Sequence, residues 1–200
     1  MHISLELMMM NMMVKKSSLK KSGVSSRKSR IRNQVSWFPP PSNYFKLNFD
    51  GSNLPNSQDS FGFVIHDPEG KVLLCGAGAL DLSISILVAV VRDLRESIRG
   101  VIYLGLRNLI IEGDNLVVIN SVRNIWKIFW TINAIILDAG EDLKQFEDVQ
   151  IRQIFREANA AADWMAHRGH TTTNITYWFY VPDFPFVVII RKDALGWPNS

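Results

Sequence analysis

The sequence predicts an α/β fold in which helices flank a mixed β-sheet. Two observations carry this prediction. Three strand-like apolar segments come first, separated by turn residues, and helical and strand-like segments then alternate along the chain. In addition, three aspartates, Asp50, Asp114 and Asp163, each lie at the end of such a segment, which allows their carboxylates to converge on one point.

The first half of the chain is predicted to form an antiparallel meander. Residues 37–43, WFPPPSN, are a proline-rich lead-in that cannot be helical. Strands are expected near residues 44–50, 61–66 and 71–78, and the DPEG segment at 67–70 supplies the turn between the second and third strands.

Helices and strands are predicted to alternate in the second half. A helix is expected over residues 85–104, because apolar residues recur there at helical spacing: Leu87, Val91, Leu94, Ile98 and Val101. The elements expected after it are a strand at 107–112, a helix at 114–124, a helix marked by Ile132, Ile135, Ile136 and Leu143, a strand at 149–155 and a helix at 157–168. From residue 171 onward, PDFPFVVII predicts one more short helix or strand.

Length and charge indicate one compact domain with extensions. The first 35 residues carry eight Lys or Arg and one Glu, which gives +7, whereas the rest of the chain carries fourteen bases and eighteen acids, which gives −4. We expect residues 1–36 to be a basic, disordered extension, residues 37–195 to be the folded domain and residues 196–200 to be a tail. A nuclear-localisation or nucleic-acid-contacting tail, an organellar transit peptide and a segment without a specific role are alternative interpretations of the extension.

The cysteine content and apolar patterning exclude two classes of protein. The single cysteine, Cys75, excludes an internal disulfide framework and fits a reducing compartment, so we expect an intracellular location in the nucleus, the cytoplasm or an organelle. The apolar run at residues 84–91 is far shorter than the roughly 20 residues that cross a bilayer, so no membrane partner is expected. Nothing in the sequence indicates an oligomer.

Four segments, in this order and spacing, resemble the plant-type ribonuclease H family: KLNFDGS, GFVIHDPEGKVL, LGLRNLIIEGDN and REANAAADWMA. Members of this family are ribonuclease H-like domains that are often found in transposon-derived genes. The resemblance covers about residues 37–195, including the W-x-P-P-P lead-in. It implies a five-stranded mixed sheet, with three antiparallel strands followed by two parallel ones, and helices on both faces.

The resemblance also implies a chemistry, which is hydrolysis of the RNA strand of an RNA–DNA hybrid by two Mg²⁺ ions. The expected partner is therefore an RNA–DNA hybrid or RNA. Asp50, Asp114 and Asp163 match three of the family's four metal-binding carboxylates and are the candidate catalytic residues. Carboxylates suit this role because Mg²⁺ is a hard cation that prefers oxygen ligands. Helix capping by Asp114 and solvation of Asp163 are alternative interpretations, which the shared register outweighs.

Two departures from the family pattern oppose full activity. Val90 stands where the family has the fourth carboxylate, a Glu, and this loss should weaken the second Mg²⁺ most. Gln153 replaces a His that is implicated in proton transfer, and an amide cannot act as a general acid or base near pH 7. Asp93, one helical turn beyond Val90, is a candidate replacement ligand. Alternatively, Asp93 is a local polar substitution that costs some packing or pairs with a base such as Arg92 or Arg95.

Binding of nucleic acid can survive the loss of chemistry. Gly51 and Ser52 follow Asp50 in a loop that approaches the RNA strand in the family, and Asn115 and Asn159 are further candidates, with capping and turn chemistry as the alternative. His66, which replaces a usual Arg, is expected to be peripheral. The sequence thus predicts a nucleic-acid-binding ribonuclease H-like domain with impaired hydrolysis. The alternative is a catalytically dead module that binds nucleic acid or protein.

Overall fold

The computed structural model describes most of residues 35–197, and residues 34–200 form one compact unit. Inside that span, the residues not described are 55–57, 81–85, 124–129, 180 and 182–183. The predicted basic extension, residues 1–36, lies almost entirely outside the described residues, so its disorder stays a prediction.

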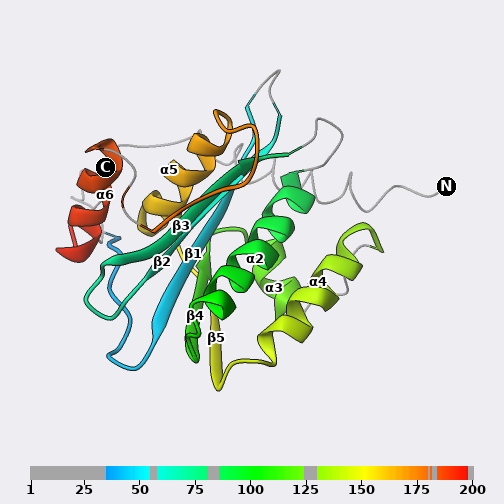
Figure 1. Ribbon diagram of the computed structural model, residues 1–200, viewed down its shortest axis with the longest axis horizontal. Coiled ribbons are helices and arrows are strands. Elements are labelled where there is room, and N and C mark those ends of the chain that lie inside the picture. Colours follow the sequence, from blue (N-terminus) through cyan, green and yellow to red (C-terminus); the bar gives the residue numbers. More distant parts are fainter. Residues whose placement is uncertain are drawn as a thin grey trace, which may run out of the picture. The chain divides into compact units, whose positions relative to one another are not determined.

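A mixed sheet of six strands forms the centre of the domain, in the order β5-β4-β1-β2-β3-β6 (Figure 1). Strands β1 (Phe45–Ser52), β2 (Ser60–His66) and β3 (Val72–Ala79) make the predicted antiparallel meander. Strands β4 (Asn108–Gly113) and β5 (Asp148–Gln153) continue the sheet in parallel on the other side of β1. The predicted α/β class and the predicted order of antiparallel and parallel strands are therefore confirmed.

The C-terminal region adds one strand to the five that the resemblance implied. Strand β6 (Thr176–Trp178) pairs antiparallel with β3, with Cys75 opposite Trp178. Helix α6 (Phe184–Ala194) follows it. The sequence predicted one short helix or strand from PDFPFVVII, which forms α6, whereas β6 lies before that segment and was not predicted.

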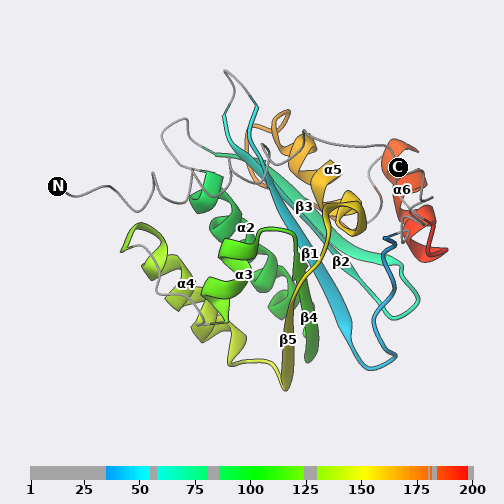
Figure 2. The same cartoon turned by 180° about the vertical axis from the view of Figure 1, so that it is seen from behind.

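Helices cover both faces of the sheet (Figures 1 and 2). Helices α2 (Ile86–Tyr103), α3 (Leu116–Val122) and α4 (Trp130–Leu143) lie on one face. Helix α5 (Ala160–Gly169) lies on the other, beside α6, and is preceded by a short 3₁₀ turn, Arg156–Ala158. Each helix lies within a few residues of its predicted range.

Alternating side chains of the strands divide the core into two layers. Leu47, Phe49 and Phe63 pack with α2, α3 and α4, whereas Val64 and Cys75 pack with α5 and α6. This division follows from the two-residue period of a strand, which sends successive side chains to opposite faces. In β2, which lies inside the sheet, every residue is buried.

Helix α5 lies directly on the backbone of β2, and Gly62 makes this approach possible. A Cβ at Gly62 would lie 2.2 Å from the main-chain nitrogen of Ala166 and from the main-chain carbon of Met165. Near Gly62, the Ser60 hydroxyl donates a hydrogen bond of 2.6 Å to the Ala166 carbonyl. A larger residue at position 62 would therefore push α5 away from the sheet.

The proline-rich lead-in is held by a buried polar network beside β1. Trp37 is buried, and its indole Nε1–H donates to Asn48 Oδ1 at 2.9 Å. The Lys46 ammonium donates to the Phe38 carbonyl at 2.6 Å and lies 3.0 Å from a Glu112 carboxylate oxygen. Because buried polar groups are costly unless they are paired, this network fixes the lead-in against the sheet.

His66 is part of the core, beside the proline-rich lead-in. Its side chain is 0% exposed, and its ring lies 4.6 Å from the Trp37 ring between centroids. Burial, with a smaller contribution from the Lys46 charge, lowers the pKa of His66 to about 3. Neither of its ring nitrogens has a hydrogen-bond partner among the described residues.

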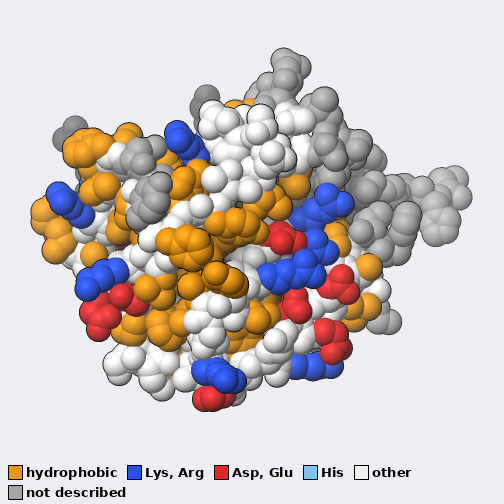
Figure 3. All heavy atoms as spheres, in the orientation of Figure 1, with side chains coloured by type: hydrophobic (Ala, Val, Ile, Leu, Met, Phe, Trp, Pro, Cys, Tyr) orange, Lys and Arg blue, Asp and Glu red, His pale blue; other side chains and the backbone are white. Residues whose placement is uncertain are grey.

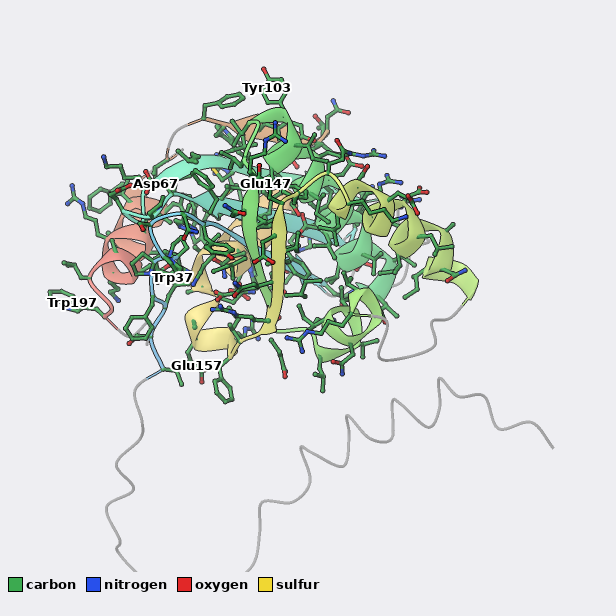
Figure 4. All side chains as sticks on the ribbon, turned by 90° about the horizontal axis from the view of Figure 1, so that it is seen from below. Trp37, Asp67, Tyr103, Glu147, Glu157 and Trp197 are labelled. Atoms are coloured by element: carbon green, nitrogen blue, oxygen red, sulfur yellow. The ribbon has the colours of Figure 1, made fainter. Side chains whose placement is uncertain are left out.

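The surface over α2 and β6 is largely apolar (Figure 3). A shallow pocket of about 310 Å³ lies there, lined by Leu74, Glu96, Arg99, Gly100, Tyr103, Tyr177 and Phe179. Tyr103, at the end of α2, points away from the domain (Figure 4). Within the described part of the chain, no helix combines the length and the apolar content that crossing a membrane requires.

Candidate active site

The three predicted aspartates line one cavity. Asp50 lies near the end of β1, Asp114 directly follows β4, and Asp163 lies in the first turn of α5. Strands β1 and β4 are parallel neighbours, so their carboxyl ends meet at the same edge of the sheet. The cavity has a volume of about 250 Å³ and is lined by Asp50, Gly51, Ser52, Asn53, Asp114, Arg156, Asp163 and His167.

Two of these carboxyl groups form an interacting pair. Burial, followed by the charge of Asp114 and, more weakly, that of Asp163, raises the pKa of Asp50 to about 8, although the Gly51 N–H donates to Asp50 Oδ1 at 2.8 Å. Burial also raises the pKa of Asp114, against smaller opposing contributions from the Arg156 charge and from the Asp50 side chain. The two carboxyl groups thus disfavour each other's ionisation, and a bound cation would favour ionisation of both.

A guanidinium group neutralises the third carboxylate. Arg156 lies in the 3₁₀ turn before α5, and its Nη2 donates to Asp163 Oδ1 at 2.6 Å. The same positive charge lowers the pKa of both Asp50 and Asp114, against the larger effect of burial. Sequence reasoning did not select Arg156, although it begins the R-E-x-N motif that was matched to the family.

The chemistry of the side chains in this cavity fits a hard divalent cation. Three carboxylates offer the oxygen ligands that Mg²⁺ and Mn²⁺ prefer. As placed, however, the described residues contain no group of three or more His, Cys, Asp and Glu side chains arranged to hold an ion. Asp163 is engaged by Arg156, so binding through all three aspartates requires this ion pair to open or to be shared.

His167 is a second cavity residue that sequence reasoning missed. Its Nδ1 lies 2.8 Å from the Asp163 carbonyl oxygen and 3.6 Å from Asp163 Oδ2. A carbonyl oxygen accepts only, so Nδ1 carries a proton in this contact. The available signal was spacing, because residues four apart on a helix lie on one face.

The candidate nucleic-acid contacts divide into two groups. Gly51 and Ser52 line the cavity, but they are the last two residues of strand β1 and not part of a loop, and Ser52 is only 6% exposed. Asn115 instead caps α3, since its side-chain oxygen accepts from the main-chain nitrogens of Val117 and Val118. Asn159 is 1% exposed and donates to the Phe49 carbonyl at 3.0 Å, which ties α5 to β1.

The positions that depart from the family pattern lie outside the cavity lining. Val90 is 2% exposed and packs in the core as part of α2, and Gln153 is exposed at the end of β5. Asp93 is 0% exposed, and the expected pairing with Arg92 or Arg95 does not form among the described residues, since Arg95 pairs with Glu96 and Asp138.

Asp93 is a buried carboxyl group that no hydrogen bond from the described residues stabilises. Neither of its oxygens has a hydrogen-bond partner among the described residues. Burial, followed by the Asp50 charge, raises the pKa of Asp93 well above its ordinary value, and the Asp50 main-chain N–H opposes this without reaching normal hydrogen-bond geometry. Asp93 thus interacts with Asp50 but is buried in the core and is not among the residues that line the cavity.

Solved structures share this fold at low sequence identity. Ribonuclease H1 from Halobacterium salinarum NRC-1 superposes with a TM-score of 0.59 at 20% identity, over 63% of this chain and 96% of its own. The N-terminal RNase H domain of a Mycobacterium tuberculosis protein gives 0.60 at 20% identity, over 64% and 94%. LC11-RNase H1, solved in complex with an RNA/DNA hybrid, gives 0.57 at 16% identity, over 63% and 96%.

Sequence comparison gives the family. No curated protein sequence matches the chain. The profile of the reverse transcriptase-like family matches residues 48–169, a span that contains all three aspartates of the cavity. This match and the shared fold together show that the chain is a ribonuclease H-like domain and belongs to the reverse transcriptase-like family.

Proposed function

We propose that this domain binds RNA–DNA hybrids and cleaves their RNA strand slowly, with a divalent cation held by Asp50, Asp114 and Asp163. The observation that carries the proposal is the convergence of these carboxylates in one cavity. A structural neighbour supports the substrate class, because LC11-RNase H1, which has this fold, was solved with an RNA/DNA hybrid.

Each cavity residue has a part in this proposal. A bound divalent cation would act as a Lewis acid on the phosphodiester and the attacking water. Asp50 and Asp114 supply its principal oxygen ligands, and Gly51 and Ser52 form the rim that the RNA strand touches. Asn115 and Asn159 support these residues from inside the protein, since their side-chain amides are already bonded to the protein itself.

Slow turnover is proposed because two groups are lacking. Val90 provides no carboxylate for a second ion, and Gln153 provides no acid or base. The same two observations favour a second candidate function, which is binding of the hybrid without hydrolysis. The two candidates differ only in the rate of the chemical step, so binding and cleavage must be measured separately.

The test is cleavage of a hybrid with a labelled RNA strand by the full chain, in Mg²⁺ and in Mn²⁺. Val90→Glu should cleave at least about 100-fold faster than the natural chain, because stabilising the leaving oxygen contributes several kcal/mol. Mn²⁺ should support the natural chain better than Mg²⁺, since it binds these ligands more tightly. Asp50→Asn should remove cleavage and leave hybrid binding in place.

Val90→Gln is the matched control, because it adds a side chain of the same size without a charge at a buried position. It should remain as slow as the natural chain. Equal rates for the natural chain and Val90→Glu would contradict the proposed impairment. Hybrid binding with no cleavage by either protein would favour the second candidate, and absence of hybrid binding would overturn both.

A further inference from the structure

We propose that the cavity is built for a single divalent ion and that the guanidinium of Arg156 takes the place of the second cation, facing a phosphate of the bound strand. This inference rests on the proposed function. It concerns a residue that is not among the aspartates that the resemblance selected, and it predicts both an ion stoichiometry and a phosphate contact.

Charge balance is the first argument. Three ionised aspartates carry −3, and Arg156 is the only Lys or Arg among the described residues that line the cavity. Together they leave −2, which one divalent ion neutralises. The family pattern of four carboxylates and two Mg²⁺ is neutral as well. With Val90 in place of the fourth carboxylate, a second divalent ion would leave the cavity with excess positive charge.

Geometry is the second argument, because the carboxylates divide into two sets. Asp50 and Asp114 line the cavity from the neighbouring parallel strands β1 and β4, whereas Asp163 lies on α5 and accepts from Arg156 at 2.6 Å. Asp50 and Asp114 are therefore left as the principal ligands of an ion, while Asp163 is shared between that ion and Arg156, which supplies the second positive charge. The Arg156 ion pair spans the 3₁₀ turn and the first turn of α5, so the guanidinium is placed by the same region that places Asp163.

Exposure is the third argument. The Arg156 side chain is 69% exposed, and the structure shows a hydrogen bond from its Nη2. A guanidinium has five N–H donors in a planar fork that matches two oxygens of a phosphate. Arg156 can therefore keep its bond to Asp163 while its outer edge binds a phosphodiester.

The experiment uses the full chain and three variants, Arg156→Gln, Arg156→Lys and Arg152→Gln. Mn²⁺ binding is measured by calorimetry and by the paramagnetic resonance signal of free Mn²⁺, and hybrid affinity is measured in EDTA over a series of salt concentrations. Arg152 is the matched control, because it is an exposed arginine on β5 that does not line the cavity.

The natural chain should bind one Mn²⁺. Arg156→Gln should bind Mn²⁺ roughly 3- to 30-fold more tightly. This range is the free energy of an exposed pair of single charges, doubled because the ion carries two charges. The same variant should bind hybrid about 10-fold more weakly, with a salt slope reduced by about 0.9, the value for one phosphate that is no longer neutralised. Arg156→Lys should keep the salt slope and lose part of the affinity, and Arg152→Gln should match the natural chain in Mn²⁺ affinity.

Two Mn²⁺ or none in the natural chain would overturn the one-ion site. Hybrid binding by the natural chain that Arg156→Gln leaves unchanged, in affinity and in salt slope, would overturn the role of Arg156 and leave the proposed function standing. Failure of the natural chain to bind hybrid would overturn the proposed function itself. All these readouts come from the natural chain and from surface variants, so they do not depend on a core substitution being tolerated.

Discussion

His66 shows how one residue can make the stability of this domain depend on pH. In the folded domain its pKa is about 3, whereas an exposed histidine has a pKa of about 6.5. The imidazole is therefore neutral when folded and takes up a proton only on unfolding. As the pH falls from about 6.5 toward 3, the unfolded chain gains this proton and the folded chain does not, so His66 lowers the free energy of unfolding.

The corresponding prediction concerns His66→Phe. Between pH 7 and pH 5, the natural chain should lose about 2 kcal/mol relative to this variant, because each pH unit below about 6.5 costs about 1.4 kcal/mol for one group. Urea unfolding at the two pH values measures the difference. The exposed histidine His167 provides the control, and His167→Gln should follow the natural chain. A constant difference between His66→Phe and the natural chain would show that His66 does not titrate on unfolding.

Single residues also show how far the sequence determines the site. The three aspartates were predictable because each lies at the end of a regular element, and parallel strands bring such ends together. Arg156 and His167 were not, because a motif gives positions along the chain but not the direction of a long side chain. The burial of His66 and Asp93 was not predicted for another reason. Polar residues are normally exposed, but every residue of β2 is buried and Asp93 on α2 is 0% exposed.

At the scale of elements, the packing of α5 on β2 determines where Asp163 lies. Gly62→Ala would place a methyl group 2.2 Å from main-chain atoms of α5, which no rotamer change can relieve. We expect this variant to lose about 3 kcal/mol or more of unfolding free energy, as overpacking against backbone does at its upper range. We also expect weaker ion binding, because α5 carries both Asp163 and His167.

Gly140→Ala is the matched control for Gly62→Ala. It makes the same chemical change within α4, where an added Cβ meets no atom within 4 Å. It should raise the unfolding free energy by about 0.5–1 kcal/mol, since alanine loses less backbone freedom in a helix than glycine. Thermal or urea unfolding compares the two. If both substitutions stabilise the domain equally, α5 can move away from the sheet at little cost.

Elements were predictable from the sequence where the pattern of apolar residues extends over many residues. The 18-residue helix α2 and the strands of the meander lie within two residues of their predicted bounds, because several side chains report each face. Strand β6 has only three residues, Thr176–Trp178. These are too few to show an alternation of apolar and polar residues, so the strand was not predicted. Two residues of the 3₁₀ turn, Glu157 and Ala158, were predicted as part of the following helix, since 3₁₀ and α segments share apolar spacing over so few residues.

At the scale of the whole chain, charge separates a basic extension from an acidic domain. Residues 1–35 carry +7 and the remainder −4, so the extension is the principal source of attraction for a polyanion. Deleting residues 1–34 should weaken hybrid binding and flatten its dependence on salt by about 0.9 for each phosphate that the extension neutralises. Fluorescence anisotropy over a salt series measures both effects. Replacing Lys15, Lys16, Lys20 and Lys21 by Gln is the control that removes charge and keeps length. An unchanged affinity and slope after the deletion would remove the extension from the binding surface.

The position of β6 beside β3 has a consequence for self-association. An uncovered outer strand offers free N–H and C=O groups to any other strand, and this invites aggregation. Strand β3 is eight residues long, largely buried and mostly apolar, so it would be such a template if it were the last strand of the sheet. The three residues of β6 pair with part of its length and are too few to recruit another chain, while the opposite outer strand, β5, carries Asp148 and Arg152. The region beyond the family match, which ends at residue 169, thus protects one margin of the sheet and should help to keep the folded chain monomeric at high concentration.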